Sequence, residues 1–142
     1  MVVLDIIKKE LENINGSFST YDTSYVYNCA VHNVSSNELY LDEIHDFPSL
    51  MLSNPSINFI QLGGNLRYKV YNCRIRGIVL DEENIEAAEL LAQDVEHVLH
   101  NYRKWEYVFQ EVRLIRVETD AGVNAPLGAM IVSFAVLDLE QQ

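Results

Sequence analysis

Two histidines, His97 and His100, stand three residues apart with Glu96 beside them, in a segment that has a helical pattern. A spacing of three places two side chains on one face of a helix, where they could hold a metal ion. The segment lacks the two-histidine, one-glutamate spacing of a zinc protease helix, and no third ligand is evident. We therefore expect both histidines to be solvated near a helix end whose dipole favours positive charge.

The other sequence patterns associated with catalysis are missing. The chain has no Gly-x-Ser-x-Gly elbow, no phosphate loop and no dinucleotide fingerprint. Cys29 and Cys73 have no metal or redox spacing, and we expect both to be buried, reduced packing residues. The carboxylates between residues 81 and 96 are spread regularly, as on a solvated helix face, and comprise Asp81, Glu82, Glu83, Glu86, Glu89, Asp94 and Glu96. The sequence thus predicts no catalytic residue, no cofactor and no metal site.

One predicted strand carries a local concentration of positive charge. Arg67, Lys69, Arg74 and Arg76 fall within ten residues, although the chain has 10 basic and 21 acidic residues and a net charge of -11. Three interpretations stay open: solvent-facing pairs with the acidic excess, a contact with an acidic surface of another subunit, or nucleic-acid binding. The last is opposed by the field of the whole chain, because that field repels a phosphate backbone.

The segment that holds the histidines is the best-defined element. Apolar residues recur at spacings of three and four over residues 85–102, which is the period of a helix that buries one face. Asp81 is a suitable N-cap, because its carboxylate can accept a hydrogen bond from a free amide of the first turn. A second one-sided apolar stripe, followed by Asn15-Gly16, predicts an N-terminal helix over about residues 2–13.

Most of the remaining chain has β patterning. Strands are predicted at residues 25–31, 47–52, 57–62, 66–80, 108–119 and 129–139, with Gly63-Gly64-Asn65 as a hairpin-type turn. The apolar face of residues 66–80 changes phase near Tyr71-Asn72, which predicts a bulge or bend. Residues 129–139 are apolar on both faces, so this strand must be covered on both sides.

Length and composition indicate one folded unit. A chain of 142 residues is large enough for a real core, and we expect residues 1–142 to form one domain. Hydrophobic residues make up 49% of the chain and there are only three prolines, which argues against disorder. No apolar run approaches the roughly 18 residues of a membrane-spanning helix. The N-terminus lacks a secretory pattern, so we expect the protein in the cytosol of the cell that makes it.

The order of these elements resembles that of the tail-terminator, or tail-completion, proteins of long-tailed phages. The resemblance rests on an N-terminal amphipathic helix, Phe47-Pro48 at a strand entry, the long strand 67–80, the helix 85–99 with its Ala-Ala-Glu-Leu-Leu centre, and the closing strands 113–120 and 126–136. It covers most of the chain. Residues 17–46 depart most from the expected layout.

The resemblance implies an α+β fold in which a small, mostly antiparallel sheet has an N-terminal helix and one long central helix packed on one side. It implies a structural virion protein without enzymatic activity, assembled in the host cytoplasm as a homohexameric ring. The ring would cap the tail tube and join the tail to the head connector, with DNA passing through without specific binding. The implied partners are other copies of the chain, the tail-tube protein and a head-completion or connector protein, with no membrane. Acidic walls fit such a conduit because they repel phosphate.

The connection between the last two strands is a second candidate interface. Residues 120–128 should form a hairpin tip, which carries Val123, Asn124 and Leu127 and only one charge, Asp120. Either the tip contacts a neighbouring subunit or the tube end, or it is a connector without a partner. For the whole chain, the alternatives are a small α+β enzyme or ligand-binding domain, or another neck or adaptor protein of a contractile device.

Overall fold

The computed structural model describes residues 3–36, 44, 46–80, 86–120 and 127–141. The helices in this part of the chain are α1 (Val3–Leu11), α2 (Glu86–His100) and the short 3-10 helix η2 (Tyr102–Lys104). The strands are β1 (Asn33–Ser35), β2 (Ser49–Leu52), β3 (Ser56–Gly63), β4 (Leu66–Leu80), β5 (Glu111–Asp120) and β6 (Leu127–Gln141). This content confirms the α+β class. Asp81, the predicted N-cap, lies outside the described residues.

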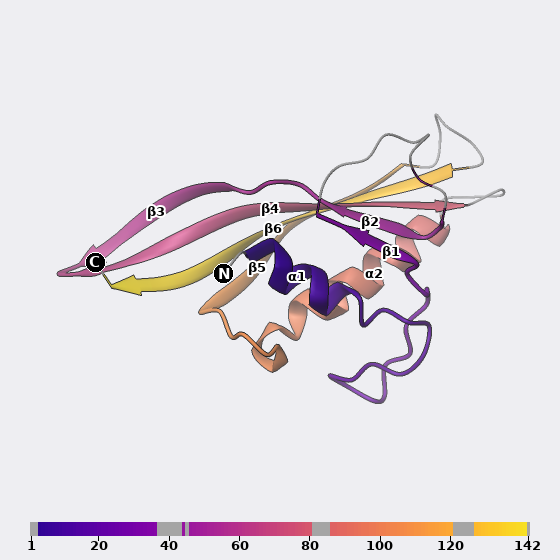
Figure 1. Ribbon diagram of the computed structural model, residues 1–142, viewed down its shortest axis with the longest axis horizontal. Coiled ribbons are helices and arrows are strands. Elements are labelled where there is room, and N and C mark those ends of the chain that lie inside the picture. Colours follow the sequence, from indigo (N-terminus) through magenta and orange to yellow (C-terminus); the bar gives the residue numbers. More distant parts are fainter. Residues whose placement is uncertain (1–2, 37–43, 45, 81–85, 121–126, 142) are drawn as a thin grey trace.

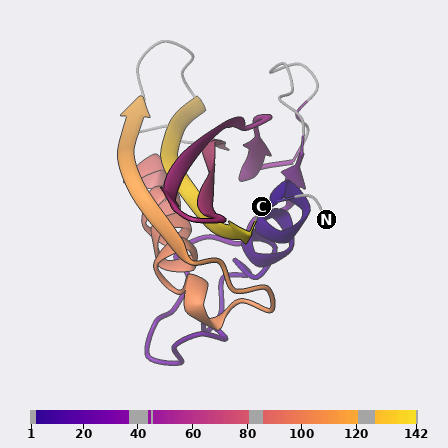
Figure 2. The same ribbon diagram turned by 90° about the vertical axis from the view of Figure 1, so that its left-hand side faces the viewer.

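The six strands form one sheet whose axis is the pair β4 and β6. The sheet order is β1-β2-β4-β6-β5, and β3 also pairs with β4. β2 and β3 share one edge of β4: β3 lies beside residues 66–72, and β2 lies beside residues 75–78. All pairings are antiparallel except that of β1 with β2, so the sheet is mostly antiparallel. Figure 2 shows how strongly this sheet curls.

Of the two alternatives predicted near Tyr71-Asn72, a bulge or a bend, the bulge is wrong. β4 pairs with β6 in an uninterrupted register from Leu66 opposite Gln141 to Leu80 opposite Leu127. What changes along β4 is the face that is covered: Ile75 belongs to the helix-side core, whereas Val70 is buried on the opposite face. Because side chains alternate along a strand, a change of covering layer produces the same phase change as an inserted residue.

The apolar stripe of α2 covers the body of the sheet. Its central residues are at most 1% exposed and share one buried cluster with the inner faces of β4 and β6; the contact involves Leu91, Val95, Leu99, Ile75 and Phe134. Both helices lie on the same side of the sheet (Figure 1). Gly77 allows the close approach, because a Cβ there would lie 2.8 Å from Leu91 and 2.7 Å from Met130.

Residues 25–31 do not form the predicted strand. The excursion over residues 12–32 contains only isolated bridges, Asn15 with Ala30 and Phe18 with Val26. Some of its backbone amides donate to carbonyls within the excursion, such as that of Tyr27 to Ser17, and two others donate to a side chain of α2. The fully buried carboxylate of Asp94 accepts hydrogen bonds from the amides of residues 28 and 29, at 3.0 and 2.8 Å, and from the hydroxyl of residue 25, at 2.8 Å. The expectation that Asp94 is solvated is therefore wrong.

His97 also belongs to this contact between α2 and the excursion. Its ring stacks on Tyr25 with a centroid separation of 3.8 Å and an interplanar angle of 5°, and Nε2 lies 2.7 Å from the Ser19 hydroxyl. Burial lowers the pKa of His97, so the neutral ring is favoured. The expectation of a solvated side chain is wrong for His97, whereas His100 is exposed.

Candidate assembly surface

Beyond the helices, the sheet continues as an arm. We use this name for β3, residues 66–72 of β4 and residues 135–141 of β6, which are hydrogen-bonded to one another. Gly63 and Gly64, with φ values of 117° and 56°, turn the chain between β3 and β4; L side chains rarely adopt such angles. Figure 1 shows the arm extending away from both helices, on the left of the view.

β3 is the most exposed strand of the arm. All eight of its residues are exposed. Its large apolar side chains stay close to half exposed: Ile57 47%, Phe59 50%, Ile60 46% and Leu62 47%. Residues 57 and 59 alternate with residues 60 and 62, so both faces of β3 carry exposed apolar side chains. A surface of this kind marks an interaction site. In the sequence β3 is an apolar strand without a charge, a pattern that does not distinguish an exposed strand from a buried one.

Side chains elsewhere in the arm contact one another. On one face, Val70, Ala135 and Leu137 are buried together. On the other face, the Arg67 guanidinium lies 4.1 Å from the ring centre of Phe59, and its Nε donates a 2.9 Å hydrogen bond to Glu140. Lys69 lies 5.4 Å from the ring centre of Tyr71. Arg67 thus pairs with an acidic residue, Glu140. The sequence predicts that β6 is covered on both faces, and side chains of the same chain cover part of the second face.

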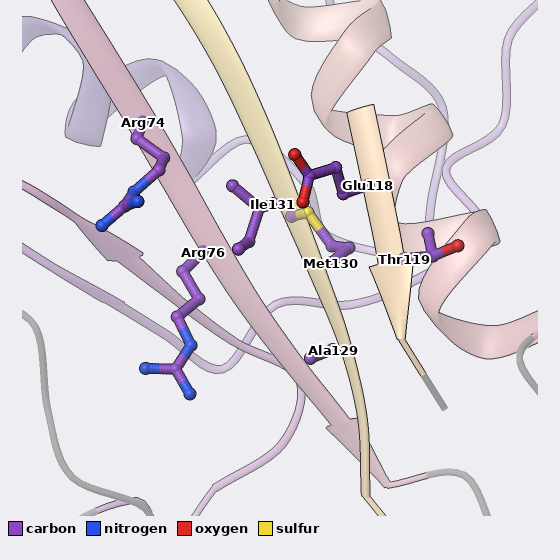
Figure 3. Close-up of a pocket in the computed structure, with 7 residues that line it drawn as sticks. All are labelled: Arg74, Arg76, Glu118, Thr119, Ala129, Met130 and Ile131. Atoms are coloured by element: carbon purple, nitrogen blue, oxygen red, sulfur yellow. The ribbon is translucent and has the colours of Figure 1, made fainter. Parts of the chain in front are cut away.

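A cavity lies on the sheet face opposite α2, where the arm joins the rest of the sheet. Its volume is about 390 Å³. Arg74 and Arg76 point to this face because they alternate with Ile75, which packs in the helix-side core. The cavity is lined by Arg74 and Arg76 of β4, by Ala129, Met130 and Ile131 of β6, and by Glu118 and Thr119 of β5. Figure 3 shows the two arginines on one side of Ile131 and Glu118 on the other.

The predicted interface residues therefore fall into separate places. Arg67 and Lys69 lie on the arm, whereas Arg74 and Arg76 line the cavity. Leu127 is the first residue of β6 and is half-buried against a small cluster of Ile44, Met51 and Ile78, so it belongs to the packed sheet and not to a loop tip. β5 and β6 pair up to Asp120 opposite Ala129, as a hairpin requires. Val123 and Asn124 lie outside the described residues.

Comparison with known families identifies the kind of protein that carries this surface. The model of the family described as "Bacteriophage Tail Tube Terminator Protein" matches residues 3–141. The chain belongs to the bacteriophage tail tube terminator family. This is the family that the order of elements in the sequence resembles, so that prediction is confirmed. The cavity and the arm are therefore surfaces of a member of this family.

A solved structure shares the fold of this chain. One chain in the structure entitled "Virion of native gene transfer agent (GTA) particle" superposes with a TM-score of 0.55 and 11% sequence identity, over 75% of this chain and 78% of that chain. At this level of identity the likeness shows a common fold. No curated protein sequence matches this chain.

Among the residues that the structure describes, no group of three or more His, Cys, Asp or Glu side chains could hold a metal ion. Both cysteines are free; Cys73 is buried as predicted, whereas Cys29 is only partly buried. Burial raises the pKa of Cys29 to about 11 and that of Cys73 to about 12, so neither is a thiolate at neutral pH. None of the described helices combines the length and the apolar character that a membrane span needs.

Proposed function

We propose that residues 1–142 form a single tail-terminator domain that assembles as a homohexameric ring, caps the tail tube and joins the tail to the head connector. The observation that carries this proposal is the family match over residues 3–141. The half-exposed apolar side chains of β3 support it, because a surface of this kind is expected to be covered by a partner. The role is structural, and no step of it is catalytic.

The charge of the chain suits a conduit for DNA. With a net charge of -11, a ring of such chains presents a negative field that repels a phosphate backbone. DNA would pass through without specific binding. The other partners are the tail-tube protein on one side and a head-completion or connector protein on the other. The protein would be assembled into the virion in the host cytoplasm.

The position and symmetry of the chain in the particle test this proposal. Cryo-electron microscopy of tailed particles should show six copies in a ring at the head-proximal end of the tube. Native mass spectrometry of the isolated ring should give about 98 kDa, because each chain has a mass of 16.3 kDa. A purified chain that is monomeric before it meets a tube agrees with this role. A stable dimer in the particle, or absence of the chain from the neck, contradicts it.

A further inference from the structure

We propose that the outer edge of β3 accepts an extended, apolar segment of the tail-tube protein as an added strand of the sheet. This inference rests on the proposed function, in which the chain caps the tail tube. Among the described strands, β3 pairs only with β4, so its other side is an edge of the sheet. About half of the backbone amides and carbonyls of an edge strand point away from the sheet, and an extended chain can bind them as a further strand.

The two long edges of the sheet differ in composition. β5, at the opposite edge, has a register shift between Leu114 and Arg116 and carries four charged side chains, those of Glu111, Arg113, Arg116 and Glu118. Charges and bulges of this kind protect an edge strand against pairing with other chains. β3 has no charged residue and no proline, and its register with β4 is regular from Ser56 to Gln61. β3 is therefore the edge that is open to strand addition.

The side chains of the arm indicate the chemistry of the added strand. In the register of the sheet, Ile60 lies opposite Tyr68, and Tyr68 lies opposite Leu139. Paired residues point to the same face, and this row alternates with the four charged residues of the arm, Arg67, Lys69, Asp138 and Glu140. The face with Ile60 therefore has no charge within the arm. Ile60 and Leu139 are each 46% exposed, so an added strand with an apolar side chain beside Ile60 would extend this row and cover it.

A second copy of this chain is a poor source of that strand. Antiparallel pairing of β3 with β3 of another copy is a two-fold contact, which closes a dimer and not a ring. The other edges that the described strands offer are β5, which is protected, and β1, which has three residues. The added strand is therefore expected from a different protein.

The capping role favours the tube protein as that partner. A cap must bind the end of the tube without presenting a new site to which another subunit can add. One open edge and one protected edge meet this requirement, because a chain bound through β3 leaves only β5 at the far edge of the sheet. A subunit with two open edges would allow further addition instead. The edge of β3 is thus assigned to the protein whose polymerisation the cap stops.

Site-specific photocross-linking in assembled particles tests the contact directly. The full-length chain would carry a photoreactive phenylalanine in place of Ile60, or, as the control, in place of Ile115, which is 59% exposed on β5. We expect cross-links to the tube protein from position 60 and not from position 115. The inference is overturned if position 60 reaches only a second copy, the connector protein, its own chain or nothing, or if both positions reach the tube protein equally. If the ring stands at the neck in that case, the proposed function survives; a neck without the chain overturns both.

Hydrogen exchange distinguishes strand addition from contact through side chains alone. Mass spectrometry would follow the backbone amides of the purified chain before and after it binds isolated tail tubes. Amides of residues 56–63 should exchange about tenfold more slowly or less on the tube, because new hydrogen bonds protect them, while those of residues 111–120 should keep their rates. Unchanged exchange in β3 would contradict the inference even if position 60 cross-links to the tube protein.

Matched substitutions give a third test. Ile60→Lys places on β3 the kind of charge that protects β5, and Ile115→Lys on β5 is its control. Both side chains are exposed, so both variants should keep the melting temperature of the parent. We expect Ile60→Lys to weaken binding to isolated tail tubes by about tenfold or more, because strand addition would bury the charge, while Ile115→Lys binds normally. Equal tube binding by the two variants would contradict the inference.

Discussion

Asp94 is the side chain that ties the irregular N-terminal excursion to α2. Its carboxylate accepts hydrogen bonds from Tyr25, from the backbone and side chain of Asn28, and from the backbone of Cys29. Burial raises the pKa of this carboxyl, and the hydrogen bonds oppose the shift. Removal of a buried acceptor costs more than one ordinary hydrogen bond, because the remaining donors lose their partner.

Asp94→Ala should therefore lower the free energy of unfolding by about 2–4 kcal/mol. Glu89→Ala is the control, because Glu89 lies on the same helix but is exposed, and it should change stability by no more than about 0.5 kcal/mol. Urea titrations followed by circular dichroism measure both values. Similar midpoints for the two variants would show that Asp94 is not an anchor.

His97 gives the fold a dependence on pH. Its pKa in the folded chain is lowered from 6.5 by burial, so the folded state binds a proton less readily than the unfolded state. Its contribution to stability is complete above pH 6.5 and is lost as the pH falls through 6.5 toward the folded pKa. Between about pH 7.5 and about pH 5 the parent should lose more stability than His97→Gln. Parallel losses in the two proteins would argue against this role.

Among the elements, α2 and the arm should differ in their contribution to stability. Leu91 is fully buried against the sheet, and Leu91→Ala should cost about 2–5 kcal/mol, since a cavity is left behind. Ile60→Ser removes a side chain that is 46% exposed and should cost far less. Thermal denaturation compares the two. A larger loss for Ile60→Ser would mean that the arm, and not α2, supports the core.

The connection between β5 and β6 is a separate element to test. We predict that replacing residues 121–126 with an Asn-Gly turn, while Leu127 stays in place against Met51 and Ile78, retains the melting temperature. The reason is that surface loop length changes stability only slowly. If the tip contacts a neighbouring subunit or the tube end, tail joining should fail in this variant. Normal tail joining in this variant would show that the segment only connects the two strands.

Local patterns in the sequence predicted most elements, and the failures have a common physical cause. Helical and strand periodicity placed α1, α2, β3 and β4 close to their observed positions. Residues 25–31 have a strand pattern, but the acceptor for the amides of Asn28 and Cys29 is Asp94, more than sixty residues away in sequence. Periodicity carries no information about such a distant partner.

The candidate surface was predictable only in part, for the same reason. The basic residues of β4 stand out in the sequence, but their separation into Arg67 and Lys69 on the arm and Arg74 and Arg76 at the cavity follows from the register of β4 with β3 and β6. The apolar pattern of β3 gives no sign that the strand is exposed. Only the paired structure shows that nothing in the described chain covers Ile57, Phe59 or Ile60 fully.

For the whole molecule, the acidic charge predicts weak affinity for DNA. With a net charge of -11, the chain should show no sub-micromolar dissociation constant for duplex DNA in about 150 mM salt, because its field repels phosphate. Fluorescence anisotropy with a labelled duplex measures this affinity. Tight binding at that salt concentration would require a basic DNA-binding surface and would contradict a passive conduit.

Tail length is the most direct test of the proposal that this chain caps the tail tube. Electron microscopy would compare tails assembled without the chain, tails assembled with it, and tails to which the purified chain is added back. The account predicts tubes of variable and excessive length without heads when the chain is absent. Uniform tails joined to heads should return when it is restored. Uniform, head-joined tails in the absence of the chain would contradict the account.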